Sequence, residues 1–270
     1  MAEGAPEEAR LVTAARALRL RLAAEQRIGH LRCVLDHLED RGNRAAILRT
    51  CEALGILHVH EIAPSEPDRG RARGVAGGGE KWLYVHTHTD ANECRLSMPG
   101  VRILAALPPM QDAPASESWH SVSGKRNKRK PAQGDDDASE ADRSEMQSAT
   151  RALAHALGEP VALEAIDFSQ PTALVFGNER FGICDELLAL CDGAFYIPLY
   201  GLTESLNVSV TAAIAMHFGR LARVTALRES GTLGPQRQGD LTEQEVTDLV
   251  RDYESRGKMH AKGNKTRRVD

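Results

Sequence analysis

This sequence of 270 residues lacks any run of about 18 apolar residues, the length that a membrane-spanning helix needs. It also lacks a basic start, because its first ten residues, MAEGAPEEAR, carry acidic side chains where a signal or transit peptide carries basic ones. These absences exclude the common membrane and secreted classes. They predict a soluble protein of the cytoplasm with no membrane partner.

Paired cysteines and an excess of positive charge are missing too. The cysteines form no C-x-x-C pair and are odd in number, so we expect reduced thiols; they stand at positions 33, 51, 94, 184 and 191. Lys and Arg number 34 against 38 Asp and Glu, a net charge of -4. Such a chain has no overall field that attracts nucleic acid, so any RNA must be held by local patches.

Three widespread site motifs are absent as well. No G-x-x-x-x-G-K-[ST] occurs, no G-x-G-x-x-G follows a strand pattern, and no G-x-S-x-G is present. These absences argue against P-loop nucleotidases, common dinucleotide-dependent dehydrogenases and α/β-hydrolases.

What the sequence does contain is an alternation of strand and helix patterns. Leucines, alanines and arginines at helical spacing predict one long amphipathic helix over residues 8–30. Helical stretches then alternate with short apolar runs that predict strands at 32–38, 56–62, 81–86, 101–107, 161–166, 172–176 and 194–199. The alternation predicts an α/β fold, in which a parallel sheet is flanked by helices on both faces.

The alternation is interrupted once, over residues 108–149. This stretch is polar and rich in Pro, Ser and Gly, so we predict a disordered insertion. It contains the basic hexamer KRNKRK at 125–130, which is typical either of a nuclear signal or RNA contact or of a solvated charged loop. A nuclear location therefore stays open as an alternative.

The insertion divides the chain into four predicted regions. An N-terminal helical extension covers 1–30, the α/β domain covers 31–107 and 150–225, and a C-terminal helix with a basic tail covers 226–270. In that last region, Thr242 and Glu245 have capping-box spacing at the start of a helix predicted over 241–254.

Two H-x-H pairs, His58/His60 and His86/His88, place each pair of rings on one face of a strand. Such a face can bind a metal ion or can form a polar strand edge or cleft wall. We expect no metal, because no Asp, Glu or Cys at metal-ligand spacing accompanies the pairs.

Three polar segments follow predicted strands. The first, NRAAILRTCEALG, contains Asn43, expected to cap a helix, and Arg49, which can grip phosphate or stabilise an oxyanion. The alternative for Arg49 is a surface pair with Glu52 or Glu39. The second, GNERFG, places Glu179 in a tight turn that starts at Gly177.

The third segment, IPLYGLTESLNVSV, leads into an apolar helix that we expect Thr203 or Ser205 to cap. In open parallel sheets, ligands bind beyond the carboxyl ends of the strands. All three segments should therefore meet at one ligand-binding edge.

Taken in order, these segments resemble the three motifs of the SpoU/TrmH branch of the SPOUT RNA methyltransferases. The family pattern is N-x-x-x-x-x-R-T-x-x-A-x-G, then G-N-E-x-x-G, then I-P-M-x-G-x-x-x-S-L-N-V-S-V. The resemblance implies an α/β knot with a C-terminal trefoil, a homodimer, and methylation of a ribose 2'-hydroxyl in RNA by S-adenosyl-L-methionine. The short arrangement resembles the tRNA guanosine methyltransferases, so guanosine in the tRNA D-loop is the expected target.

The resemblance also implies the site residues. Arg49 is the expected catalytic cation, with Asn43, Glu179, Ser205 and Asn207 orienting ribose, phosphate and loop. The cofactor is expected against Ala106, Leu174, Gly177, Ile197 and Leu206. The alternatives are a ribosomal RNA 2'-O-methyltransferase and a catalytically silent RNA-binding protein of the same fold.

Overall fold

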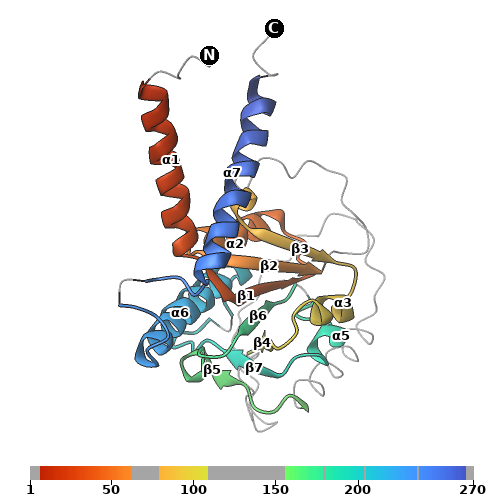
Figure 1. Ribbon diagram of the computed structural model, residues 1–270. Coiled ribbons are helices and arrows are strands. Elements are labelled where there is room, and N and C mark those ends of the chain that lie inside the picture. The colour runs from red at the N-terminus through yellow and green to blue at the C-terminus, as the bar shows by residue number, and fades with distance from the viewer. Residues whose placement is uncertain are drawn as a thin grey trace, which may run out of the picture.

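The computed structural model describes residues 7–62, 79–108, 156–178, 181–203, 205–235 and 237–265. Seven strands form one sheet in the order β3-β2-β1-β6-β4-β7-β5, and every neighbouring pair is parallel. The strands are β1 Ile28–Asp36, β2 Ile56–Ile62, β3 Tyr84–His88, β4 Arg102–Ala106, β5 Val161–Ala162, β6 Thr172–Phe176 and β7 Gly193–Tyr196 (Figure 1). The predicted α/β class with a parallel sheet is confirmed.

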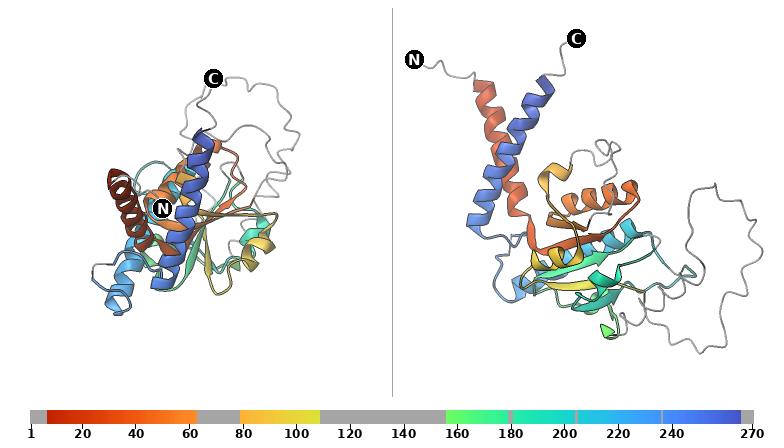
Figure 2. Two further views of the ribbon diagram at one scale, coloured as in Figure 1. Left: turned by 45° about the horizontal axis from the view of Figure 1, so that its top comes forward. Right: turned by 90° about the vertical axis from the view of Figure 1, so that its right-hand side faces the viewer.

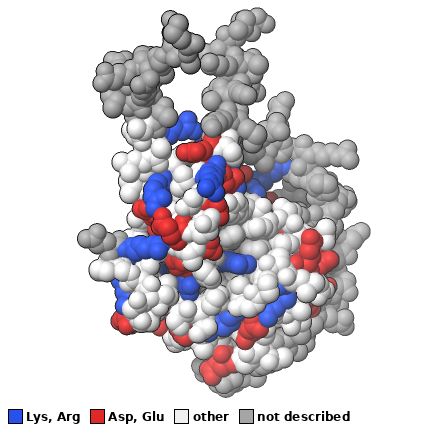
Figure 3. Space-filling view, viewed as in Figure 1, with Lys and Arg blue, Asp and Glu red and all other residues white. Residues whose placement is uncertain are grey.

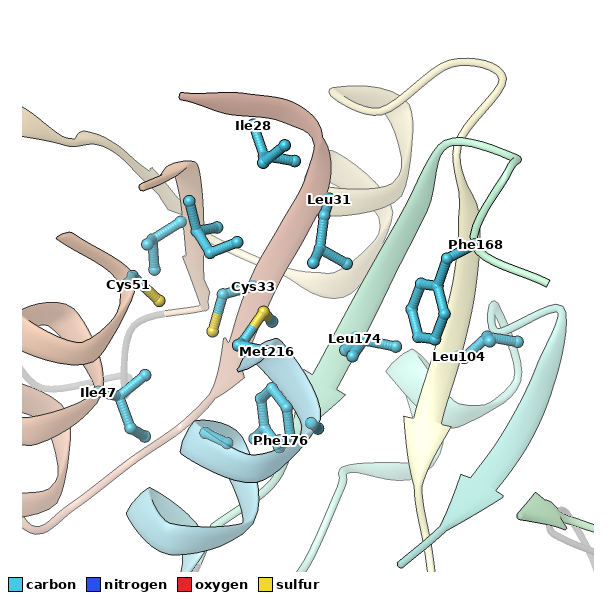
Figure 4. Packing of buried hydrophobic residues seen from close by; sticks show 14 of the residues in the cluster. Ile28, Leu31, Cys33, Ile47, Cys51, Leu104, Phe168, Leu174, Phe176 and Met216 are labelled. Atoms are coloured by element: carbon cyan, nitrogen blue, oxygen red, sulfur yellow. The ribbon is translucent and has the colours of Figure 1, made fainter. Parts of the chain in front are cut away.

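Helices cover both faces of the sheet. On one face lie α2 (Arg41–Ala53) and α6 (Val208–Glu229), and on the other lie α3 (Ala91–Leu96) and α5 (Asp185–Leu188). The central strand β1 contributes side chains to the core on both faces of the sheet. Leu31 and Cys33 pack towards α2 and α6, and Val34 packs towards α3 and α5. Figure 4 shows the first layer, with side chains from α2 and α6 packed against β1 and β6.

The two terminal helices form one unit. α1 (Glu7–Glu25) and α7 (Glu243–Lys265) contact each other and extend away from the sheet, with both chain ends on the same side (Figures 1 and 2). Arg21 pairs with Glu243, and the Tyr253 hydroxyl donates to the Trp82 carbonyl over 2.9 Å. The capping box of α7 is confirmed, since the Thr242 backbone N–H donates to the Glu245 carboxylate over 2.7 Å.

The prediction of a single helix over 8–30 is wrong at its C-terminal end. α1 ends at Glu25, and β1 already begins at Ile28. The backbone N–H groups of Gly29 and His30 donate to the carboxylate of Asp240, 2.6 and 3.4 Å away, rather than to helical carbonyls. A residue more than 200 positions away therefore accepts hydrogen bonds from the backbone just beyond the end of this helix.

The predicted strand over 161–166 is also largely wrong. Only Val161 and Ala162 pair, with β7, and the chain then turns into a short 3-10 helix, η3 (Leu163–Ala165). A second such helix, η1 (Gly79–Trp82), precedes β3. The insertion beyond Pro108 and its basic hexamer lie outside the described residues. Among the helices that are described, none is long and apolar enough to cross a membrane.

Candidate functional site

The carboxyl ends of four adjacent strands form one edge. β1, β6, β4 and β7 run parallel in the order β1-β6-β4-β7, so the loops that follow them leave the sheet on the same side. α2 follows β1, the loop from Gly177 follows β6, and the segment from Ile197 follows β7. The expectation that the three polar segments start at one edge is confirmed.

The first and third segments touch directly. The Asn207 side-chain amide donates to the Asn43 side-chain oxygen over 3.1 Å, which joins the start of α2 to the start of α6. The Asn207 oxygen in turn accepts from the Ser209 backbone N–H at 2.8 Å. A hydrogen bond between residues 164 positions apart thus brings two of the three motifs together.

Both predicted helix caps are wrong, for one reason. The cap of α2 is Asp40, whose carboxylate accepts from the Asn43 backbone N–H at 2.9 Å, and the cap of α6 is Asn207 rather than Thr203 or Ser205. Capping needs an extended residue directly before the first helical one, and in both cases the helix begins elsewhere than the pattern suggested. The Asn43 side chain is thereby left to contact Asn207.

Arg49 lies on the outer face of α2. It is exposed, as are Gly42 and Ala46, which stand seven and three residues before it. At roughly 100° per residue it is turned about 240° from Asn43, so the two side chains do not share a face. Glu52, one of its suggested surface partners, pairs with Arg27. Within one chain, Arg49 is presented outward rather than towards the Asn43–Asn207 contact.

The second segment forms a tight loop. Asn178 and Gly182 exchange two backbone hydrogen bonds of 2.8 and 2.9 Å, and Gly182 has a left-handed φ of 77°. A Cβ atom at Gly177 would lie 2.3 Å from the Gly182 carbonyl carbon, so no side chain fits there. Glu179, the predicted site residue of this loop, lies outside the described residues, and its role stays a prediction.

Two residues that sequence reasoning missed, Asp36 and His37, hold this loop against the end of β1. Asp36 is 1% exposed, and its carboxylate accepts from the Cys184 backbone N–H at 2.6 Å. The Asn178 amide donates to the His37 carbonyl over 2.7 Å, and His37 itself has a positive φ of 49°. Asp36 and His37 stood inside a predicted strand, so no local signal marked them as loop anchors.

The half-buried Cys184 thiol is unsuited to nucleophilic chemistry. Burial, and then the neighbouring Asp36 carboxylate, raise the pKa of Cys184 to about 12. A thiol with such a pKa is protonated at neutral pH. The role of Cys184 in this loop is therefore structural.

Replacing Gly177 by alanine should displace the loop, because the added methyl group meets backbone rather than a flexible side chain. We expect a loss of cofactor binding in calorimetry together with a lower melting temperature. The matched control is Gly234, where a Cβ atom would have no neighbour within 4 Å, and Gly234→Ala should leave both unchanged. Equal behaviour of the two variants would contradict this account of the loop.

The predicted cofactor residues divide into two groups. Ala106, Ile197 and Leu206 are half-buried, and the first two pack against the main core cluster from the ends of β4 and β7. Leu174 is fully buried in the middle of β6, so its side chain supports the strand. Ser205 is exposed two residues before the α6 cap.

This edge fits an adenosine-type cofactor. Half-buried apolar side chains from two strand ends, with a glycine turn beside them, leave surfaces that a purine and an aliphatic chain can cover. Charges elsewhere are mixed: on the face in Figure 3, basic and acidic side chains are interspersed without one large field of either sign.

Comparison with known proteins shows which family the chain resembles. Residues 100–217 match the SpoU rRNA Methylase family. A Thermus thermophilus protein named tRNA (guanosine(18)-2'-O)-methyltransferase is 30% identical over 217 residues, 79% of this chain and 86% of its own. An Aquifex aeolicus protein of the same name is 24% identical over 245 residues, 90% of each chain.

The solved structures agree on the fold. The crystal structure of the Aquifex aeolicus TrmH/SpoU tRNA modifying enzyme superposes with a TM-score of 0.60, at 24% identity over 90% of this chain and 98% of that one. The fold and its polar edge thus define a parallel α/β protein, and the 30% identity to the Thermus thermophilus protein over 86% of its length shows the family. The chain belongs to the SpoU methylase family.

Proposed function

We propose that this protein methylates the ribose 2'-hydroxyl of a guanosine in the D-loop of tRNA, with S-adenosyl-L-methionine as donor. The observation that carries the proposal is the named activity of relatives that align over most of both chains, including 30% identity to the Thermus thermophilus enzyme over 86% of its length. The contact between Asn43 and Asn207 supports it, because it joins the two motifs that the family pattern assigns to the site.

The half-buried edge beside Gly177 is the proposed cofactor site. Ala106 and Ile197 would flank the cofactor from two strand ends, and Leu206 would close it from the start of α6. When bound, S-adenosyl-L-methionine supplies an electrophilic methyl group on a cationic sulfur. The loop anchors Asp36 and Asn178 would keep the Gly177 turn in place for that contact.

The chain's polar residues would position and activate the acceptor. A ribose hydroxyl is a poor nucleophile at neutral pH, so its placement in line with the methyl group and stabilisation of the developing alkoxide lower the barrier. Arg49 would act as a cation that holds RNA phosphate and stabilises the oxyanion. Asn43, Asn207, Ser205 and Glu179 would orient ribose and loop without exchanging protons.

A homodimer is part of this proposal. Val210, Ile214 and Leu221 are 44%, 40% and 54% exposed and share one face of α6. Tyr200 and Leu202, in the loop before the helix, are also exposed. A second copy seated on α6 would also approach α2, which packs beside it, and would bring the outward Arg49 to an interface.

An acidic residue at position 214 should therefore dissociate the dimer. We expect Ile214→Asp to convert the chain from dimer to monomer in sedimentation experiments, because a buried unpaired carboxylate is costly. The control is Leu96→Asp, since Leu96 is 80% exposed on α3, on the opposite face of the sheet. A wild-type chain that sediments as a monomer would refute this part of the proposal.

The activity is tested with labelled S-adenosyl-L-methionine and unmodified tRNA. We expect one 2'-O-methylated guanosine per tRNA, mapped to the D-loop, and none when that guanosine is replaced by adenosine. Binding of the cofactor is measured separately by calorimetry. Cofactor binding without methyl transfer to any RNA would favour the silent RNA-binding alternative.

Ribosomal RNA is the second candidate substrate, on one observation. A Bacillus subtilis protein named 23S rRNA (guanosine(2553)-2'-O)-methyltransferase RlmP is 44% identical to this chain over 62 residues, which is 23% of the chain. The sequence identity is high but covers a short stretch, so it supports shared site motifs more than a shared substrate. Methylation of ribosomal RNA fragments but not of tRNA would decide for this alternative.

A further inference from the structure

Four histidines lie outside the site described above, on the face of the sheet that α3 covers. His58 and His60 come from β2, His86 and His88 from β3, and the parallel register places His60 beside His86. Their rings stack in the order 58-86-60-88, with centroids 5.3, 4.6 and 5.3 Å apart and interplanar angles of 20, 19 and 6°. We call these four residues the histidine ladder.

One end of the histidine ladder is buried against a cysteine. His60 and His88 are 2% and 5% exposed, so they do not form the predicted polar edge, and Cys94 of α3 is fully buried. The His60 Nδ1 and His88 Nε2 atoms are 3.0 Å apart. One ligand atom from each of His60, His88 and Cys94 lies within 4.8 Å of the others. Ligands of a tetrahedral zinc ion are about 3.3–3.6 Å apart, so small side-chain movements suffice.

Not every ring nitrogen of this cluster has a hydrogen bond among the described residues. Nε2 of His60 and Nδ1 of His88 are buried and have no hydrogen-bond partner among the residues that the structure describes. Buried polar atoms in folded proteins are nearly always paired, and each exception calls for an explanation. These two atoms are the outer nitrogen of each ring, so no hydrogen bond there fixes either ring, and the facing nitrogens, His60 Nδ1 and His88 Nε2, can turn towards an ion.

Local charge favours a cation at the cysteine end of the ladder. Burial first, and then the carboxylates of Asp36 and Glu93, raise the pKa of the Cys94 thiol to about 12, so an ion would have to displace its proton on binding. Glu93 and Asp90 place negative charge beside His88. The opposing positive charge, that of Arg32, lies near His60 and near His58 at the other end of the ladder.

We propose that His60, His88 and Cys94 bind a zinc ion that ties α3 to strands β2 and β3. Imidazole nitrogen and thiolate are the ligands that zinc prefers, and the Ser97 hydroxyl, 3.3 Å from His60 Nδ1, or a water molecule would take the fourth position. On binding, the S–H bond of Cys94 breaks, a sulfur–zinc bond forms and the proton goes to solvent.

The test uses cobalt(II) in place of zinc on the purified full chain, after treatment with a chelator. We expect one cobalt ion per chain, a sulfur-to-cobalt charge-transfer band in the near ultraviolet, and loss of both on addition of zinc. Cys94→Ser should abolish the charge-transfer band. The matched control is Cys191→Ser, because Cys191 is also buried and belongs to the same core cluster.

Stability provides a second measurement. Zinc should raise the melting temperature of the wild-type chain and of Cys191→Ser, but not that of Cys94→Ser or His88→Gln. No charge-transfer band in the wild type, or the same band in Cys94→Ser, would overturn the proposal. Since the measurements need neither RNA nor S-adenosyl-L-methionine, their outcome is independent of the proposed methyl transfer.

Discussion

Replacing Arg49 by alanine should lower the rate of methyl transfer on the order of 10²-fold or more, the usual cost of removing a group that stabilises a developing oxyanion. The loss should appear mainly in kcat, because the interaction strengthens as the alkoxide forms. The melting temperature should hardly change, since the Arg49 side chain is exposed on the outer face of α2. Rates are measured with labelled S-adenosyl-L-methionine and saturating tRNA.

Two further variants test the same prediction. Arg49→Lys keeps the charge but loses the planar fork of the guanidinium, so it should recover only part of the rate. Arg19→Ala removes an exposed arginine of α1 and should leave kcat unchanged. Turnover by Arg49→Ala close to that of the wild type would remove Arg49 from the chemistry and leave it at most an RNA contact.

Replacing Asp240 by alanine should cost about 3–5 kcal/mol in the free energy of unfolding, the range for breaking a buried ion pair. Its side chain is 2% exposed and pairs with Arg223, which is 6% exposed. Arg223 also donates to the Phe168 carbonyl at 3.1 Å, so the variant would leave a buried cation without its counter-ion. The Gly29 backbone N–H would lose its acceptor as well. Denaturant titration at neutral pH measures the change.

An exposed pair provides the matched control. Asp248 and Arg251 are 3.1 Å apart on α7, with side chains 57% and 72% exposed. Asp248→Ala should cost less than about 1 kcal/mol, because exposed pairs are screened by water. If the two aspartate variants lost equal stability, Asp240 would not join the segment before α7 to α6 and β1 as its contacts with Arg223 and Gly29 indicate.

The same carboxylate makes stability depend on pH. Burial acts to raise the pKa of Asp240, but the hydrogen bond from His30, the charge of Arg223 and the Gly29 N–H outweigh it, and the net pKa is lowered. A group with a lowered folded-state pKa contributes stability that is present above its unfolded value, about 3.9, and is lost as pH falls through the folded value. The wild type should therefore lose more stability than Asp240→Asn below about pH 4.

The parts of the fold that were predictable from sequence are those with a local signal. Strands β2 and β6 coincide with their predicted ranges, because short runs rich in aliphatic and β-branched residues between turn residues are typical of strands. The predicted strand at 161–166 failed because a short apolar run does not distinguish a strand from other buried backbone. The predicted end of the first helix was wrong because Asp240, which accepts from the backbone beyond Glu25, is remote in sequence.

The site shows the same division. The sequence by itself determined which segments resemble the family motifs, since Asn43, Arg49 and Asn207 stand in motifs that are contiguous in the chain. Only the tertiary structure decided that the Asn43 amide meets Asn207, that Asp36 anchors the Gly177 loop, and that Cys94 lies against the histidine ladder. The physical reason is that strand register and helix packing choose these partners, and both depend on contacts between residues far apart in the chain.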